Sequence, residues 1–216
     1  MTRELQSGRR GPEKAGSVIV FLHGYGADGA DLLGLADPLG RYLPDTAFHA
    51  PNAPEPCRNN PFGFQWFPIP WLDGSTETQA RASMEKSIDD VNAFLDAVLV
   101  REGLGADRMV VVGFSQGTMM ALHILPRRDD AVAGIVGFSG RLLAPELLDQ
   151  VKVRPPVMLL HGDQDQMVPF ADMGLAERAL SGANFTVTTH TMRGTGHGIS
   201  PDGLGVALSF LRKVLD

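Results

Sequence analysis

Short apolar runs recur along the chain and alternate with segments of helical periodicity. The clearest run covers residues 18–22, where five consecutive apolar residues include valine, isoleucine and phenylalanine. A continuous run of this kind predicts a strand that is buried on both faces, as in a parallel sheet. Further strands are expected at 46–50, 109–112, 132–138 and 157–160, and a more alternating one at 184–190.

The longest helical pattern spans residues 76–102. Apolar residues three and four positions apart form one stripe along it, namely Met84, Ile88, Val91, Leu95 and Val98. Such spacing places them on one face of a helix, where they would pack against the sheet. Glycines at positions 103 and 105 are typical of a helix end.

Two other helices are expected. One lies near the C-terminus, with its apolar face formed by Leu204, Leu208, Leu211 and Leu215, and a weaker one covers residues 31–41. Because strands and helices alternate through most of the chain, the fold class is α/β, with a mostly parallel central sheet flanked by helices. In such sheets active sites gather at the carboxyl ends of the strands.

Composition narrows the range of partners. The 216 residues fit one domain, which we place at 17–216 after a polar N-terminal segment at 1–16. The net charge is −6 and no more than two basic residues are adjacent, so nucleic acid is not an expected partner. No apolar stretch approaches the roughly 20 residues of a membrane span. The sequence does not determine the oligomeric state, and a homodimer is one possibility.

The expected location is the cytoplasm. Segment 1–16 has no apolar core of the kind found in signal peptides. Cys57 is the single cysteine, so an intrachain disulfide and a cysteine-rich metal site are both excluded.

The sequence Gly113-Phe114-Ser115-Gln116-Gly117 directly follows the apolar run at 109–112. This G-x-S-x-G pattern, between a strand and a helix, is typical of a tight turn that exposes a nucleophilic serine. The glycines are expected because a Cβ at either position would clash in so sharp a turn. The helix that follows would aim its N-terminal N–H groups at an oxyanion formed there.

A serine hydroxyl needs a base, and the base needs an orienting carboxylate. In the arrangement that accompanies this turn, the chain order is serine, acid, histidine. Asp163 and Asp165 follow the strand at 157–160, and His197 lies in a glycine-rich loop before the last helix. The order is therefore the required one, and either aspartate could be the acid at this stage.

An oxyanion hole needs two N–H donors. The residue after the serine, Gln116, would supply one of them. The loop after the first strand, which begins His23-Gly24-Tyr25, would supply the other, and the Tyr25 N–H is the natural candidate. His23 and His161 each end a strand before a glycine, and we interpret both as hydrogen-bonded scaffold residues.

Several motifs together resemble one family. They are H-G-Y-G-A-D at 23–28, Trp66-Phe67, G-F-S-Q-G at 113–117, Ser139-Gly140, H-G-D-Q-D-Q-M-V-P at 161–169 and G-T-G-H-G at 194–198. In this order they resemble α/β-hydrolases of the phospholipase/carboxylesterase family, which includes bacterial carboxylesterases and acyl-protein thioesterases. The resemblance implies the α/β-hydrolase fold without a large lid domain, no metal and no cofactor. It also selects Asp165 as the acid, three residues before Val168-Pro169.

The stretch at 60–74 departs from the family pattern because it is longer and more aromatic near Trp66. Two interpretations are open. The aromatic residues could form a small satellite core, or they could line the apolar pocket that receives the acyl group. We favour a pocket formed by Trp66, Phe67 and Trp71, with Met119 from the helix after the serine as a further candidate.

The expected function is a serine carboxylesterase acting on small to medium acyl esters through Ser115, His197 and Asp165. Acyl thioesters and lysophospholipids are alternative substrates for the same chemistry. A peracid-forming enzyme would use the same three residues. A non-catalytic binding protein on this scaffold is disfavoured, because such proteins usually lose one member of the triad.

Overall fold

A seven-stranded sheet forms the centre of the computed structural model, which describes residues 2–216. Its order is β1-β3-β2-β6-β7-β8-β9, and every neighbouring pair is parallel except β1 and β3. The strands are β1 (Ser7–Arg10), β2 (Ser17–Leu22), β3 (Thr46–Pro51), β6 (Met109–Phe114), β7 (Gly134–Phe138), β8 (Val157–Gly162) and β9 (Val187–Met192). The predicted fold class, a mostly parallel sheet flanked by helices, is confirmed.

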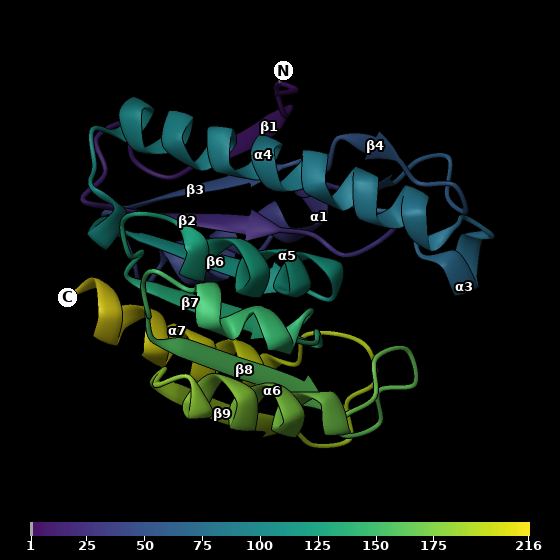
Figure 1. The fold of residues 1–216 in the computed structure, drawn as a ribbon. Coiled ribbons are helices and arrows are strands. Elements are labelled where there is room, and N and C mark those ends of the chain that lie inside the picture. The colour runs from purple at the N-terminus through teal and green to yellow at the C-terminus, as the bar shows by residue number, and fades with distance from the viewer. Residues whose placement is uncertain (1) are drawn as a thin grey trace.

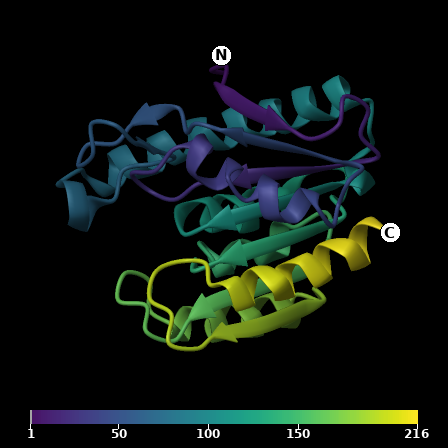
Figure 2. The same cartoon turned by 180° about the vertical axis from the view of Figure 1, so that it is seen from behind.

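Alternate residues of the strands enter two separate apolar cores. In β2, Val18 and Val20 face one core while Ile19 and Phe21 face the other. On the first face lie α4 (Glu77–Glu102), α5 (Gln116–Ile124) and α6 (Ala171–Gly182), as Figure 1 shows. On the second face lie α1 (Gly29–Leu33), α2 (Ala36–Gly40) and α7 (Pro201–Leu215), as seen from behind in Figure 2. Both faces of the sheet are thus covered, which is why its strands are continuous apolar runs.

The long helix α4 follows the prediction closely. Thr76 caps its start in a capping box with Gln79, and Gly103 ends it with a φ of 67°. The predicted apolar stripe is present, and Val91, Leu95 and Val98 are buried in the first core. A neighbouring row of polar residues, Ser83, Ser87 and Asp90, is buried as well.

Two predicted elements differ in the structure. The helix expected over 31–41 is divided into α1 and α2, because Pro38 has no N–H to donate to residue 34 and its ring would strike that carbonyl. The strand expected from residue 184 begins at Val187. Asn184 has a φ of 65°, and the Phe185 N–H donates to the Leu180 carbonyl, so these residues finish α6 instead.

The irregular stretch after β3 contains short elements. They are β4 (Glu55–Pro56) and β5 (Phe64–Gln65), which pair antiparallel, and α3 (Pro70–Asp73). Three 3-10 helices lie elsewhere, η1 (Ala106–Arg108), η2 (Leu125–Arg127) and η3 (Pro145–Gln150). Among residues 2–216, no helix is both long enough and apolar enough to cross a membrane.

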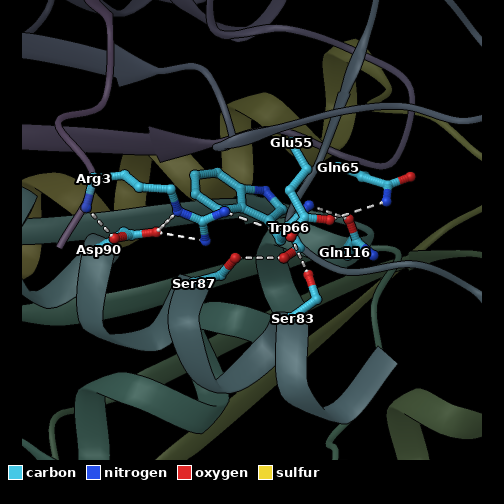
Figure 3. Close-up of polar contacts among 8 residues, drawn as sticks. All are labelled: Arg3, Glu55, Gln65, Trp66, Ser83, Ser87, Asp90 and Gln116. Carbon is cyan, nitrogen blue, oxygen red and sulfur yellow. Dashed lines mark hydrogen bonds and ion pairs between the residues drawn. The ribbon is translucent and has the colours of Figure 1, made fainter. Parts of the chain in front are cut away.

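The polar N-terminal segment adds the edge strand β1 to the sheet, so the boundary we placed at residue 17 does not coincide with the sheet's edge. Two arginines of this segment reach α4. The Arg3 guanidinium contacts the buried carboxylate of Asp90 at 2.7 Å (Figure 3). Arg9 donates two hydrogen bonds to Glu102, at 2.9 and 2.8 Å, and His49 donates a third at 2.7 Å.

These contacts predict acid-sensitive stability. The hydrogen bonds from Arg9 lower the pKa of Glu102 from 4.5 to about 2. Because the folded-state pKa is depressed, the stabilisation is complete above the unfolded-state value and is lost as the pH falls towards 2. Glu102→Gln removes this dependence. Between pH 6 and about pH 3, urea titration should show that the wild-type free energy of unfolding falls by about 2 kcal/mol more than that of the variant. Equal losses in both proteins would contradict the assignment.

Candidate active site

Ser115 occupies a strained turn between β6 and α5. Its φ is 53° and its ψ is −114°, a conformation that non-glycine residues adopt rarely. A Cβ on Gly117 would collide with the Leu22 carbonyl oxygen, and a Cβ on Gly113 would collide with the Thr118 backbone nitrogen. Gly117 therefore lets α5 start directly against the end of β2, and Gly113 lets the first turn of α5 fold back onto β6. The Ser115 N–H donates to the Phe138 carbonyl of β7 at 2.8 Å, which fixes the turn from the other side.

Asp165 and His197 contact each other although 32 residues separate them. The His197 Nδ1 lies 2.8 Å from Asp165 Oδ2, and the Asp165 side chain is fully buried. Its other oxygen, Oδ1, accepts the N–H groups of Met167 and Val168. Oδ2 also lies 3.3 Å from the Nε2 of His161, which donates to the Val168 carbonyl.

These hydrogen bonds keep Asp165 ionised. Burial raises the pKa of the carboxyl, but hydrogen bonds from His197, Val168 and Met167 outweigh burial and hold the net pKa below its ordinary value. A fixed carboxylate at Nδ1 selects the His197 tautomer whose Nε2 can accept a proton.

Asp163 has a different contact. Its Oδ1 accepts the N–H of Gly194, at 2.7 Å, in the loop that leads to His197. The structure thus brings Asp165 to the imidazole and places Asp163 under the turn of the histidine loop.

Ser115 and His197 line the same cavity. The His197 ring packs on Phe114, the residue before the serine, with the ring centres 4.9 Å apart. Among the hydrogen bonds formed by residues 2–216, none joins the Ser115 hydroxyl to His197. Hydrogen bonds between a nucleophile and its base are often long in the absence of substrate and tighten when substrate binds.

The predicted oxyanion residues also reach the cavity. Tyr25 and Gln116 both line it, and a Cβ on Gly24 would lie 3.3 Å from the Ser115 Cβ. The loop after β2 is therefore packed directly against the serine. His23 supports this loop, because its Nδ1 hydrogen-bonds the Gly24 carbonyl and its Nε2 accepts the Ala53 N–H. Burial lowers the pKa of His23, which keeps the imidazole neutral in this arrangement.

The cavity has a volume of about 780 Å³ and a mainly apolar lining. Phe67, Trp71 and Met119, three of the four predicted pocket residues, line it. Other apolar lining residues come from α3, α4 and the loops after β7 and β8: Ile69, Leu72, Met84, Leu143, Ala144, Met167 and Val168. The charged residues that line the cavity are Glu77, Arg81 and Arg141.

Trp66, the fourth predicted pocket residue, requires a correction. Its side chain is fully buried in the first core and is not among the residues that line the cavity. The indole N–H donates to the His23 carbonyl at 2.9 Å, which fixes the ring in its buried position. Trp66 thus belongs to the first core rather than to a separate satellite core, whereas Phe67, the next residue, lines the cavity.

Sequence reasoning missed Asp73. Its Oδ2 accepts the N–H of Ile69 at 2.9 Å and the hydroxyl of Tyr25 at 3.2 Å, and its Oδ1 accepts the N–H of Ser75. The carboxylate therefore ties α3, which carries Trp71, to the loop after β2. The only sequence signal for this role was the position of Asp73, an aspartate at the end of the short helix that contains Trp71. Met84, predicted in the apolar stripe of α4, packs against the first core and in addition lines the cavity, which the sequence pattern did not indicate.

Among residues 2–216, no group of three or more histidine, cysteine or acidic side chains is arranged to hold a metal ion.

Comparison of the sequence with known protein families identifies the family of this chain. The sequence model of the phospholipase/carboxylesterase family matches residues 7–215. The chain belongs to this family. It is 29% identical to acyl-protein thioesterase 1 of Gibberella zeae, over 92% of this chain and 91% of the relative. It is 26% identical to esterase YpfH of Escherichia coli K12, over 94% and 86% of the two chains.

A solved structure extends the likeness. The crystal structure of esterase PE8 superposes with a TM-score of 0.92 at 39% identity, and the match covers 99% of this chain and 100% of that one. The family member described here is therefore a carboxylic ester hydrolase with the α/β-hydrolase fold, and no large lid domain is present among residues 2–216.

The position of Trp71 predicts an effect on substrate choice. Its ring lines the cavity but is 74% exposed, so its removal should cost little stability. In Trp71→Ala, kcat/KM for long-chain acyl esters should fall relative to short-chain esters by about 10-fold, within the 1–3 kcal/mol range of one apolar contact. Phe62→Ala is the matched control, because Phe62 is an 88% exposed aromatic residue of the same irregular stretch after β3 and does not line the cavity. An equal loss for all chain lengths in Trp71→Ala would exclude a pocket role.

Proposed function

We propose that the protein is a serine carboxylesterase that hydrolyses small to medium acyl esters through an acyl-enzyme on Ser115. The observation that carries the proposal is the 2.8 Å contact between His197 and the buried Asp165, in the cavity that Ser115 also lines. A cytoplasmic location belongs to the proposal and is supported by the single cysteine, Cys57, which is buried and unpaired.

The proposed reaction has two halves. The Ser115 Oγ attacks the acyl carbonyl while the Nε2 of His197 takes the hydroxyl proton, and the Asp165 carboxylate stabilises the imidazolium that results. The N–H groups of Tyr25 and Gln116 bind the oxyanion. Collapse of the tetrahedral intermediate breaks the bond to the alcohol, which receives the proton from His197. Water then attacks the acyl-enzyme by the same route and releases the carboxylic acid.

The apolar cavity supports an acyl group of moderate size as the substrate part that enters it. The second candidate function is an acyl thioesterase or lysophospholipase with the same three residues. It is favoured by the relatives named acyl-protein thioesterase 1, which match more than nine tenths of this chain. A panel of p-nitrophenyl esters of increasing length, assayed beside an acyl-CoA and a lysophospholipid, separates these candidates by kcat/KM. Adding hydrogen peroxide and assaying peracid distinguishes an esterase from a perhydrolase.

The nucleophile can be identified directly. A fluorophosphonate should add once, with loss of fluoride, to the peptide that contains Ser115, because the strained turn exposes that hydroxyl beside a base. Mass spectrometry of the digested protein locates the adduct. Ser115→Ala should take up no label and should show no acyl-enzyme turnover, while its unfolding transition stays close to wild type. Normal turnover by Ser115→Ala would refute the proposal.

The two aspartates give a second test. Asp165→Asn removes the ion partner of His197 and should lower kcat by about 10³- to 10⁴-fold. Asp163→Asn weakens the bond to Gly194 and should act mainly on stability, with kcat within a few-fold of wild type. Steady-state kinetics and thermal unfolding of both variants decide between the two aspartates. If Asp163→Asn shows the larger loss of kcat, the acid has been assigned wrongly.

A further inference from the structure

Trp66 forms hydrogen bonds with both of the segments that carry the proposed oxyanion donors. Its backbone N–H donates to the side-chain Oε1 of Gln116 at 2.9 Å, and its indole N–H donates to the backbone carbonyl of His23 at 2.9 Å. Figure 3 shows Trp66 between Gln116 and Ser87. The Ser87 hydroxyl, from the buried polar row of α4, donates to the Trp66 carbonyl at 2.5 Å. The tryptophan is thus held by α4 and contacts both the loop after β2 and the first residue of α5.

The first of these contacts, from the Trp66 backbone N–H, reaches Gln116, the residue after the proposed nucleophile. Gln116 is buried, and its side-chain amide spans two neighbouring residues, because Nε2 also donates to the Phe67 carbonyl at 2.7 Å. Both polar ends of this side chain are therefore occupied by the segment at 66–67. The same residue's backbone N–H is the first proposed oxyanion donor, so its position depends on where this segment lies.

On the other side the contact reaches the second donor through His23. The Nδ1 of His23 donates to the Gly24 carbonyl at 2.7 Å, and that carbonyl shares a peptide group with the Tyr25 N–H. In a planar trans peptide the two groups point in opposite directions, so fixing the carbonyl fixes the direction of the N–H. Trp66 in turn fixes His23, by the bond to its carbonyl and by ring packing at 5.3 Å.

We propose that Trp66 and the Gln116 side chain form a positioning bridge that sets the Tyr25 and Gln116 N–H groups relative to each other. The inference rests on the proposed function, since it assigns these N–H groups to the oxyanion. Neither side chain touches the reacting atoms in this role. The bridge acts through geometry, because preorganised donors stabilise a developing charge only when they already point at the place where it forms.

A purely structural role for Trp66 gives a different expectation. A large buried ring stabilises the fold by apolar contact alone, and its loss would lower stability without singling out the transition state. If the bridge positions the two donors, its removal should instead weaken only the stabilisation of the oxyanion. The two roles therefore differ in whether binding of a tetrahedral species weakens more than binding of the ground-state ester.

Two variants separate the halves of the bridge. Trp66→Phe keeps the aromatic bulk and the backbone N–H but removes the indole donor to His23. Gln116→Met keeps the backbone N–H and the side-chain length but removes both amide contacts. A double variant combines them. Phe48→Leu is the stability control, because Phe48 is a buried aromatic residue in the second core, on the opposite face of the sheet.

The measurement compares ester turnover with inhibition by a trifluoromethyl ketone that carries the same acyl chain. The Ser115 Oγ adds to the carbonyl carbon of the ketone, its proton passes to His197, and the former carbonyl oxygen becomes an oxyanion in the hole. Each bridge variant should lower kcat about 10-fold or more while KM changes less than about threefold, within the 10²- to 10³-fold that loss of one whole donor costs. The inhibition constant of the ketone should rise in proportion to the loss of kcat/KM. The double variant should lose less than the product of the two single losses.

Phe48→Leu should lower the unfolding temperature and leave kcat and the inhibition constant unchanged. The inference is overturned if Trp66→Phe and Gln116→Met lose stability while kcat and the inhibition constant keep their wild-type values. It is also overturned if the variants raise KM and the inhibition constant by the same factor with kcat unchanged. Gln116→Met carries the test alone if Trp66→Phe does not fold. Ser115→Ala separates failure of the bridge from failure of the proposed function. If Ser115→Ala is inactive and the bridge variants are unaffected, only the bridge is refuted. If Ser115→Ala is active, the proposed function is refuted.

Discussion

The turn at Ser115 is the constraint on which the rest of the site depends. It forces a non-glycine residue into a positive φ. The turn forms only because Gly113 has no Cβ to strike the first turn of α5 and Gly117 has none to strike the end of β2. This close approach brings the loop after β2 beside the serine. It also lies where the strand order turns back, with β3 on one side of β2 and β6 on the other, which is where open parallel sheets leave room for ligands.

A second constraint is the buried polar row of α4. Ser83, Ser87 and Asp90 do not enlarge the apolar core; they receive segments that have little regular structure of their own. Ser87 holds Trp66, Ser83 donates to Glu55 in β4, and Asp90 binds Arg3 (Figure 3). Buried polar groups of this kind specify one arrangement, because each unpaired group would cost free energy. The irregular stretch after β3 is therefore held in place although it contains only short elements.

The chemistry and the choice of substrate lie on different parts of the molecule. The proposed catalytic groups follow β2, β6, β8 and β9, so the sheet fixes them. The cavity wall comes from α3, the exposed end of α4 and the loops near Leu143 and Val168, which the sheet does not fix. Asp73 joins the two parts, since it binds both α3 and the hydroxyl of Tyr25. Variation in the wall can thus change the acyl group that is accepted while the strand ends remain the same.

The sequence by itself determined the parallel sheet, the helix α4 with its two ends, and the order of Ser115, Asp165 and His197. These features depend on local patterns: buried apolar runs, helical spacing, and glycines at turns that no other residue can form. The residues alone left Asp163 and Asp165 open and the family resemblance selected Asp165, but only the tertiary structure gives the physical reason: two N–H groups, of Met167 and Val168, aim Asp165 at the imidazole while Gly194 engages Asp163. It also decided that Trp66 is buried and Phe67 lines the cavity, since neighbouring residues of an irregular loop point where distant partners such as His23 and Ser87 hold them.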